Sequence, residues 1–126
     1  METFDFLIVG AGCAGASGAM YASRMNLKTV MVAEMPGGLI TTTHSVENWP
    51  GIVNISGPDL ALSLLNHASA FGVELKNERV NSLEKVQIPQ ENGVGAGFIV
   101  TTADNKYMAK TVLLATGTKH KHKGVP

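Results

Sequence analysis

The stretch that decides the fold is FDFLIVGAGCAG at residues 4–15, followed by TVMVAE at residues 29–34. The run Phe4–Val9 is apolar but for one acid and passes directly into glycines, which is typical of a buried strand in a parallel sheet. From Ala14 to about Met25 the residues are mostly small or helix-favouring, with no proline. Lys28–Ala33 predicts a second strand. The order strand, glycine turn, helix, strand predicts a right-handed βαβ unit.

The glycine turn carries a chemical prediction. Gly10, Gly12 and Gly15 form G-x-G-x-x-G, in which the first glycine makes the tight turn, the second admits a pyrophosphate and the third lets the helix pack on the strand. The helix N-terminus adds free N–H groups and roughly half a positive charge. The second strand ends at Glu34, where an acid accepts hydrogen bonds from ribose hydroxyls and repels a 2′-phosphate. The pattern therefore favours FAD or NAD over NADP. The alternative is a turn that merely packs, with Glu34 as a solvated strand end.

Composition narrows the class of protein. The 126 residues suit one domain, and we propose no boundary within the chain. Ten basic and ten acidic residues argue against nucleic acid as the main partner. One cysteine excludes a disulphide framework within the chain. There is no apolar run of the ~20 residues that a membrane helix needs, so we expect a soluble cytoplasmic protein without a membrane partner.

The middle of the chain predicts a long ordered loop and then a helix. Met35–Ser56 is rich in glycine, proline and threonine, and loops of this length in compact domains are usually functional. Gly57-Pro58-Asp59 marks a helix start, and Gly72 follows its end. The apolar face of this helix comprises Leu60, Leu64, Leu65, Ala68 and Phe71.

The last third of the chain predicts short strands. Asn92-Gly93 lies within an expected hairpin loop, Pro89–Gly97. The expected extended segments are Val73–Leu75, Arg79–Ile88, Phe98–Thr102, Tyr107–Ala109 and the buried strand Thr111–Ala115.

Three further motifs carry a family resemblance. Gly37–Thr43 reads GGLITTT, Val46–Gly51 reads VENWPG, and Ala115–Gly117 reads ATG at the end of a buried strand. Together with the glycine turn, they resemble the low-molecular-weight thioredoxin reductases, flavoproteins of the two-dinucleotide-fold disulphide reductase group. The match runs from Phe4 to the C-terminus.

The resemblance implies an α/β, Rossmann-like FAD-binding fold with a central parallel sheet and a small added β-meander. Residues 1–126 would form the N-terminal part of the FAD domain, incomplete relative to the family. FAD is the implied cofactor, and we expect no metal and no catalytic residue in this chain. The implied cofactor-binding residues are Gly10, Gly12, Cys13, Ala14 and Gly15 at the pyrophosphate, Glu34 at the ribose, Gly37, Gly38 and Leu39 on the flavin side of the pyrophosphate, Thr42, Thr43 and Asn48 beside the ribityl chain and ring, Val80 at adenine, and Ala115, Thr116 and Gly117 over the cofactor.

The sequence departs from the family pattern in three respects. The family commonly has proline where Cys13 stands and glutamine where Leu39 stands, which removes one polar contact near the flavin. The family's NADPH-binding domain, its redox-active C-x-x-C and a closing FAD segment have no counterpart in these 126 residues. We therefore expect this chain alone to lack NADPH-dependent disulphide reductase activity, and a thioredoxin-like protein to be a partner of the whole enzyme only.

Two other interpretations remain open. One is a non-catalytic nucleotide-binding or assembly module, in which a homodimer or a complementing chain buries exposed sheet surface. The other is part of a ferredoxin- or flavodoxin-type NADP reductase. Of the remaining residues, we expect Cys13 to be a small packing residue and His67 to lie on a helix surface. The basic tail 119–123, with His120 and His122, is expected to be a solvated connector rather than a metal or nucleic-acid site.

Overall fold

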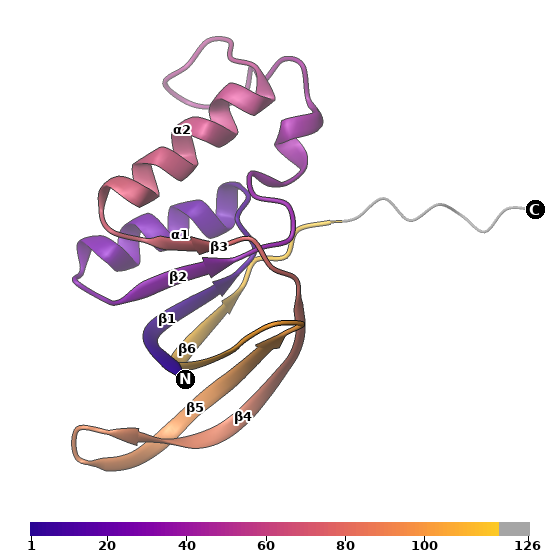
Figure 1. Ribbon diagram of the computed structural model, residues 1–126. Coiled ribbons are helices and arrows are strands. Elements are labelled where there is room, and N and C mark those ends of the chain that lie inside the picture. Colours follow the sequence, from indigo (N-terminus) through magenta and orange to yellow (C-terminus); the bar gives the residue numbers. More distant parts are fainter. Residues whose placement is uncertain (119–126) are drawn as a thin grey trace, which may run out of the picture.

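The computed structural model describes residues 1–118 as a mixed sheet with two α-helices (Figure 1). The basic tail lies outside the described residues. Figure 1 shows both α-helices on the same side of the sheet and the β4–β5 hairpin extending away from them. The elements in chain order are β1 (Glu2–Val9), α1 (Cys13–Arg24), β2 (Thr29–Val32), the 3-10 helix η1 (Gly38–Thr42), α2 (Gly57–Ala70), β3 (Glu74–Lys76), β4 (Val80–Gln90), β5 (Gly93–Thr102) and β6 (Lys106–Leu114).

The sheet has the order β3-β2-β1-β6-β5-β4. Strands β3, β2, β1 and β6 are parallel neighbours, whereas β5 and β4 continue the sheet as antiparallel strands. The predicted βαβ unit, the parallel sheet and the added meander are therefore confirmed. The meander is continuous with the central sheet rather than a separate layer.

The core lies on both faces of the parallel strands. Ile8 and Met31 face the helices and pack with small residues of α1 such as Ala19. Leu7 and Val30, their neighbours in sequence, face the other side and pack with Tyr107. A strand buried on both faces must be apolar at successive positions, which explains the apolar runs Phe6–Val9 in β1 and Val30–Val32 in β2.

The helix boundaries follow local chemistry. Ser56 caps α2, because its hydroxyl oxygen accepts a hydrogen bond from the Asp59 amide at 3.1 Å. Gly72, just beyond this helix, has φ of +94°. The prediction that Phe71 belongs to the buried face of α2 was wrong. Its ring is 43% exposed at the helix end, where the Arg24 guanidinium lies 5.9 Å from the ring centroid.

The loop predictions were partly wrong. The expected loop Met35–Ser56 contains η1 and two isolated bridges, Val46 with Ile55 and Trp49 with Ile52. Most of the expected loop Pro89–Gly97 is strand, because β4 and β5 are joined by two residues only, followed by Gly93 with φ of +119°. The two connecting residues are Glu91 and Asn92, so the Asn-Gly pair lies one residue later than in a turn that has both of them at its centre.

Strand β6 also differs from prediction, because the two expected strands form one. Its first half pairs with β5 as far as Ala109, while β1 pairs along its other edge as far as Leu114. Within residues 1–118, no strand pairs with the second edge of Thr111–Leu114. The side chain of Leu114 at this edge is 64% exposed.

The packing of α2 gives a paired stability prediction. Leu60 is 2% exposed and Leu62, two residues along, is 58% exposed. Leu60→Ala should lower the free energy of unfolding by about 2–4 kcal/mol, because it removes buried methyl groups and leaves a cavity. Leu62→Ala should change it by less than about 1 kcal/mol. Urea unfolding of both variants measures the difference, and equal losses would contradict this packing.

Candidate nucleotide-binding site

The predicted glycine turn lies where three parallel strands end. The Gly10 amide donates a hydrogen bond to the Val32 carbonyl at 2.9 Å, and the Ala115 amide donates to the Val9 carbonyl at 2.9 Å. Gly10 has φ of +119°, and a Cβ atom there would collide with the Ala115 carbonyl oxygen. Only glycine fits this position. The structure thus joins the glycine turn to the start of the Ala115–Gly117 motif.

The rest of the glycine turn forms the N-terminus of α1. Gly12 is the N-cap residue and makes no side-chain cap, so the amides of Cys13, Ala14 and Gly15 lie in the first turn without an intrahelical acceptor. A Cβ atom on Gly15 would collide with the Gly10 carbonyl oxygen. The third glycine therefore allows the close approach of helix and turn that the motif predicts.

The second glycine pair faces the first motif. The Gly37 amide donates to the Ala11 carbonyl at 2.8 Å, and a Cβ atom on Gly38 would lie 3.0 Å from the Gly12 Cα. A Cβ atom on Gly12, in contrast, would lie 3.7 Å from its nearest neighbour outside α1, the Gly38 Cα. Two backbone segments without side chains therefore lie against each other at a helix N-terminus. This arrangement fits an anionic pyrophosphate.

The residues expected along the flavin follow this pair in η1. Leu39 is half-buried, and its carbonyl accepts a hydrogen bond from the Thr42 hydroxyl at 2.7 Å. The Thr43 carbonyl accepts from the Gly57 amide at 2.9 Å, so η1 is tied to the start of α2. Asn48 is exposed on the bridged loop, and no hydrogen bond within residues 1–118 joins it to the glycine segments. Leu39, Thr42 and Thr43 therefore lie directly after the second glycine pair, whereas Asn48 lies on the bridged loop that follows them.

The strand-end motif after β6 is open to solvent. Thr116 and Gly117 are exposed, and Gly117 has φ of +73°. They extend from Ala115, which contacts the glycine turn. Their position agrees with a segment that lies over a bound ligand.

Glu34 and Val80, predicted for the adenosine end, come from different strands. Glu34 is exposed just beyond β2 and lines a pocket of about 360 Å³ with Asn77 and Arg79. Val80, the first residue of β4, is half-buried and packs against the core beneath the sheet. The sequence analysis missed Asn77 and Arg79 because no motif marks them. The one available signal was their position directly before the expected adenine contact.

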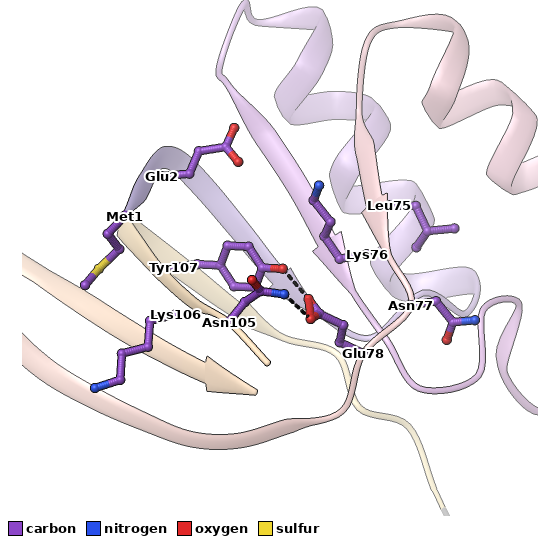
Figure 2. Close-up of a pocket in the computed structure, with 9 residues that line it drawn as sticks. All are labelled: Met1, Glu2, Leu75, Lys76, Asn77, Glu78, Asn105, Lys106 and Tyr107. Carbon is purple, nitrogen blue, oxygen red and sulfur yellow. Dashed lines mark hydrogen bonds between the residues drawn. The ribbon is translucent and has the colours of Figure 1, made fainter. Parts of the chain in front are cut away.

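A second, adjoining pocket contains a polar cluster centred on Glu78 (Figure 2). Its carboxylate accepts hydrogen bonds from the Tyr107 hydroxyl, from Asn105 Nδ2 at 2.5 Å and from the Thr102 hydroxyl at 3.1 Å. The hydrogen bond from Tyr107 is the main cause that lowers the pKa of Glu78. Burial, and then the Glu78 carboxylate, raise the pKa of Tyr107 to about 12.

Cys13 is half-buried as the first residue of α1, and His67 is exposed on α2 as expected. The ring centroid of His67 lies 5.5 Å from that of Phe71. Neither α-helix of the described part is long and apolar enough to cross a membrane.

The comparisons with known proteins agree with this geometry. Residues 4–126 match the family model described as pyridine nucleotide-disulphide oxidoreductase. The chain belongs to this family. It is 37% identical over 126 residues to the thioredoxin reductase of Bacillus subtilis, covering 99% of this chain and 37% of that protein. It is also 39% identical to the thioredoxin reductase of Treponema pallidum, covering 100% and 39% of the two chains.

The structural comparison identifies the same fold. The crystal structure of thioredoxin reductase from Streptococcus pyogenes MGAS5005 matches with a TM-score of 0.86 and 38% identity, over 98% of this chain and 38% of that one. The chain thus spans less than two fifths of the length of these relatives. The predicted resemblance and fold class are confirmed, and the chain corresponds to the thioredoxin reductase-like flavoprotein region that the sequence analysis expected.

The Glu78 cluster predicts an unusual tyrosine titration. Folded Tyr107 should ionise near pH 12, above the ordinary value of 10.0. Because the pKa of Tyr107 is raised in the folded chain, the stabilisation by its neutral hydroxyl is complete below pH 10. This stabilisation is lost as the pH rises toward 12. Ultraviolet absorbance of phenolate against pH should show this late step. Tyr107→Phe should remove it, and a titration without a late step in the folded wild type would contradict the cluster.

Proposed function

We propose that this chain binds FAD through its pyrophosphate and adenosine. The observation that carries the proposal is the close contact between the glycine backbones of Gly12 and Gly37–Gly38 at the N-terminus of α1. Backbone amides and a helix dipole there favour a diphosphate. Glu34, beyond the neighbouring strand β2, supports a ribose contact and disfavours a 2′-phosphate.

In this proposal, different residues of the chain contact successive parts of FAD. Amides of Cys13, Ala14 and Gly15 bind phosphate oxygens, and the η1 segment from Leu39 to Thr43 lies beside the ribityl chain. Thr116 and Gly117 cover the ligand from the end of β6, while Asn48 approaches the ring from its loop and the Val80 backbone binds adenine. FAD, when bound, supplies reversible acceptance of a pair of electrons. The chain itself supplies binding and orientation.

We further propose that the whole protein is a thioredoxin reductase-like oxidoreductase. In this proposal electrons pass from NADPH through the flavin to a disulphide and on to a thioredoxin-like protein. The residues of this chain hold the flavin, and other parts of the protein supply the nicotinamide site and the dithiol. Support comes from the family match and from identities of 37% and 39% to thioredoxin reductases.

An assembly role is a second candidate, favoured by the open edge of β6. Backbone groups of Thr111–Leu114 have a strand partner on one side only within residues 1–118, and Leu114 is exposed beside them. An unpaired edge with an apolar side chain favours pairing with a further strand. A complementing chain or a second copy of this chain can supply it.

The binding proposal is tested by a single added methyl group. Gly12→Ala should be tolerated by the fold, because the added Cβ would lie 3.7 Å from its nearest neighbour outside α1, the Gly38 Cα. That methyl group would occupy the space of the pyrophosphate, so FAD affinity should fall at least about tenfold, or 1.4 kcal/mol. Fluorescence titration of FAD measures the affinity. Gly18→Ala on the same helix is the matched control and should bind as the wild type does. Its Cβ would lie 2.9 Å from Leu113 Cδ2, the end of a flexible side chain that can move aside.

Two results would contradict the binding proposal. One is a folded wild-type chain that binds no FAD. The other is a Gly12→Ala variant that binds FAD as tightly as the wild type, since the glycine turn would then not contact the pyrophosphate.

The assembly proposal is tested by hydrodynamic measurement. The wild-type chain should self-associate as its concentration rises, and Leu114→Lys should weaken this association by adding a charge at the open edge. Leu62→Lys, at a similarly exposed leucine of α2, should leave it unchanged. Sedimentation velocity measures the mass. A wild-type monomer at every concentration would contradict pairing between copies and leave the complementing chain as the partner.

A further inference from the structure

The connector between β3 and β4 holds the end of β2 in place. With its amide assigned so that the nitrogen faces the two carbonyls, Asn77 donates from Nδ2 to the Glu34 carbonyl at 2.9 Å and to the Ala33 carbonyl at 3.1 Å. The Ala33 amide donates to the Lys76 carbonyl at 3.0 Å. Three hydrogen bonds between residues 33–34 and residues 76–77 therefore fix the backbone that carries Glu34.

The next residue anchors the connector on the opposite side. Figure 2 shows the Asn77 and Glu78 side chains pointing away from each other, with Glu78 directed at Tyr107 and Asn105. The Glu78 carboxylate thereby ties the connector to the turn between β5 and β6. The hydrogen bonds of Glu78 thus restrain the backbone of its neighbour Asn77.

Glu34 itself has no comparable restraint. Its side chain is exposed, and within residues 1–118 no hydrogen bond or salt bridge holds its carboxylate. The direction in which the carboxylate projects is therefore set by the backbone after β2. Ligand contacts lose strength when a contacting group must first be ordered, so restraint of that backbone favours binding.

We propose that Asn77 is a positioning residue, which sets Glu34 for the 2′- and 3′-hydroxyls of an adenosine ribose. This inference rests on the proposed function. In the absence of the Asn77 amide, the Ala33 and Glu34 carbonyls are free to turn toward water and the carboxylate loses its fixed direction. Asn77 acts through Glu34 and needs no contact with the ligand.

The test uses ADP and 2′-deoxy-ADP as probes on the 126-residue chain. The wild type should bind ADP more tightly, because only ADP offers the 2′-hydroxyl. Asn77→Ala should weaken ADP binding about tenfold, the scale of a lost hydrogen bond or two, and should remove the preference over 2′-deoxy-ADP. Asn66→Ala, at an exposed asparagine of α2, is the matched control and should change neither affinity nor preference.

A double-mutant cycle distinguishes positioning from general stabilisation. In a Glu34→Ala background, Asn77→Ala should cause no further loss of ADP affinity, since both changes remove the same contact. Asn77→Asp keeps the shape but offers the carbonyls no donor, and should give the same loss on a chain whose urea unfolding shows it to be folded.

The outcomes are separable. If the wild type binds neither ADP nor FAD, the proposed function fails, and the positioning role fails with it. If the wild type binds ADP but the folded Asn77 variants keep the preference for ADP, or if the two losses add in the double mutant, the positioning role is overturned while the binding function stands.

Discussion

The close approach of backbone at Gly10 is the constraint on which the site depends. Its amide contacts the end of β2, and a side chain in its place would collide with Ala115 at the end of β6. Three strand ends can converge only because this residue has no Cβ and adopts a positive φ. The same absence of side chains at Gly12, Gly37 and Gly38 leaves amides and a helix N-terminus as the groups that would face the proposed pyrophosphate. The fold and the proposed binding site therefore share one requirement.

Strand β6 connects this site to the rest of the sheet. Its first half pairs with β5 of the antiparallel hairpin along one edge, and both halves pair with β1 of the parallel sheet along the other edge. The connector at Asn77 and Glu78 joins the same two regions from the other side, because Glu78 contacts residues that flank the β5–β6 turn. The pocket beside Glu34 thus depends on packing between the meander and the parallel strands.

The sequence predicted the features that local chemistry controls. The glycine spacing placed the turn, the alternation of strand and helix gave the βαβ unit, and Gly57-Pro58-Asp59 marked the start of α2. The errors came from tertiary context. The hairpin is longer than expected. Added Cβ atoms on Gly95 and Gly97 would collide with the side chains of Gln90 and Ile88, so these glycines mark close packing across the strands and not a loop. Phe71 has the sequence spacing of the apolar face of α2, but it follows the last helical residue, Ala70, and its ring is exposed. The roles of Asn77 and Glu78 were not predicted, because their hydrogen-bond partners lie in distant parts of the chain, near β2 and the β5–β6 turn.

The central claim is that the first turn of α1 and the end of β2 bind one dinucleotide. The most direct measurement is a two-dimensional ¹⁵N–¹H NMR titration of the chain with FAD. The account predicts the largest shifts at the amides of Cys13, Ala14, Gly15 and Glu34, with little change at the β4–β5 turn. Shifts centred on the Glu78–Tyr107 pocket, or spread without preference over the surface, would contradict it.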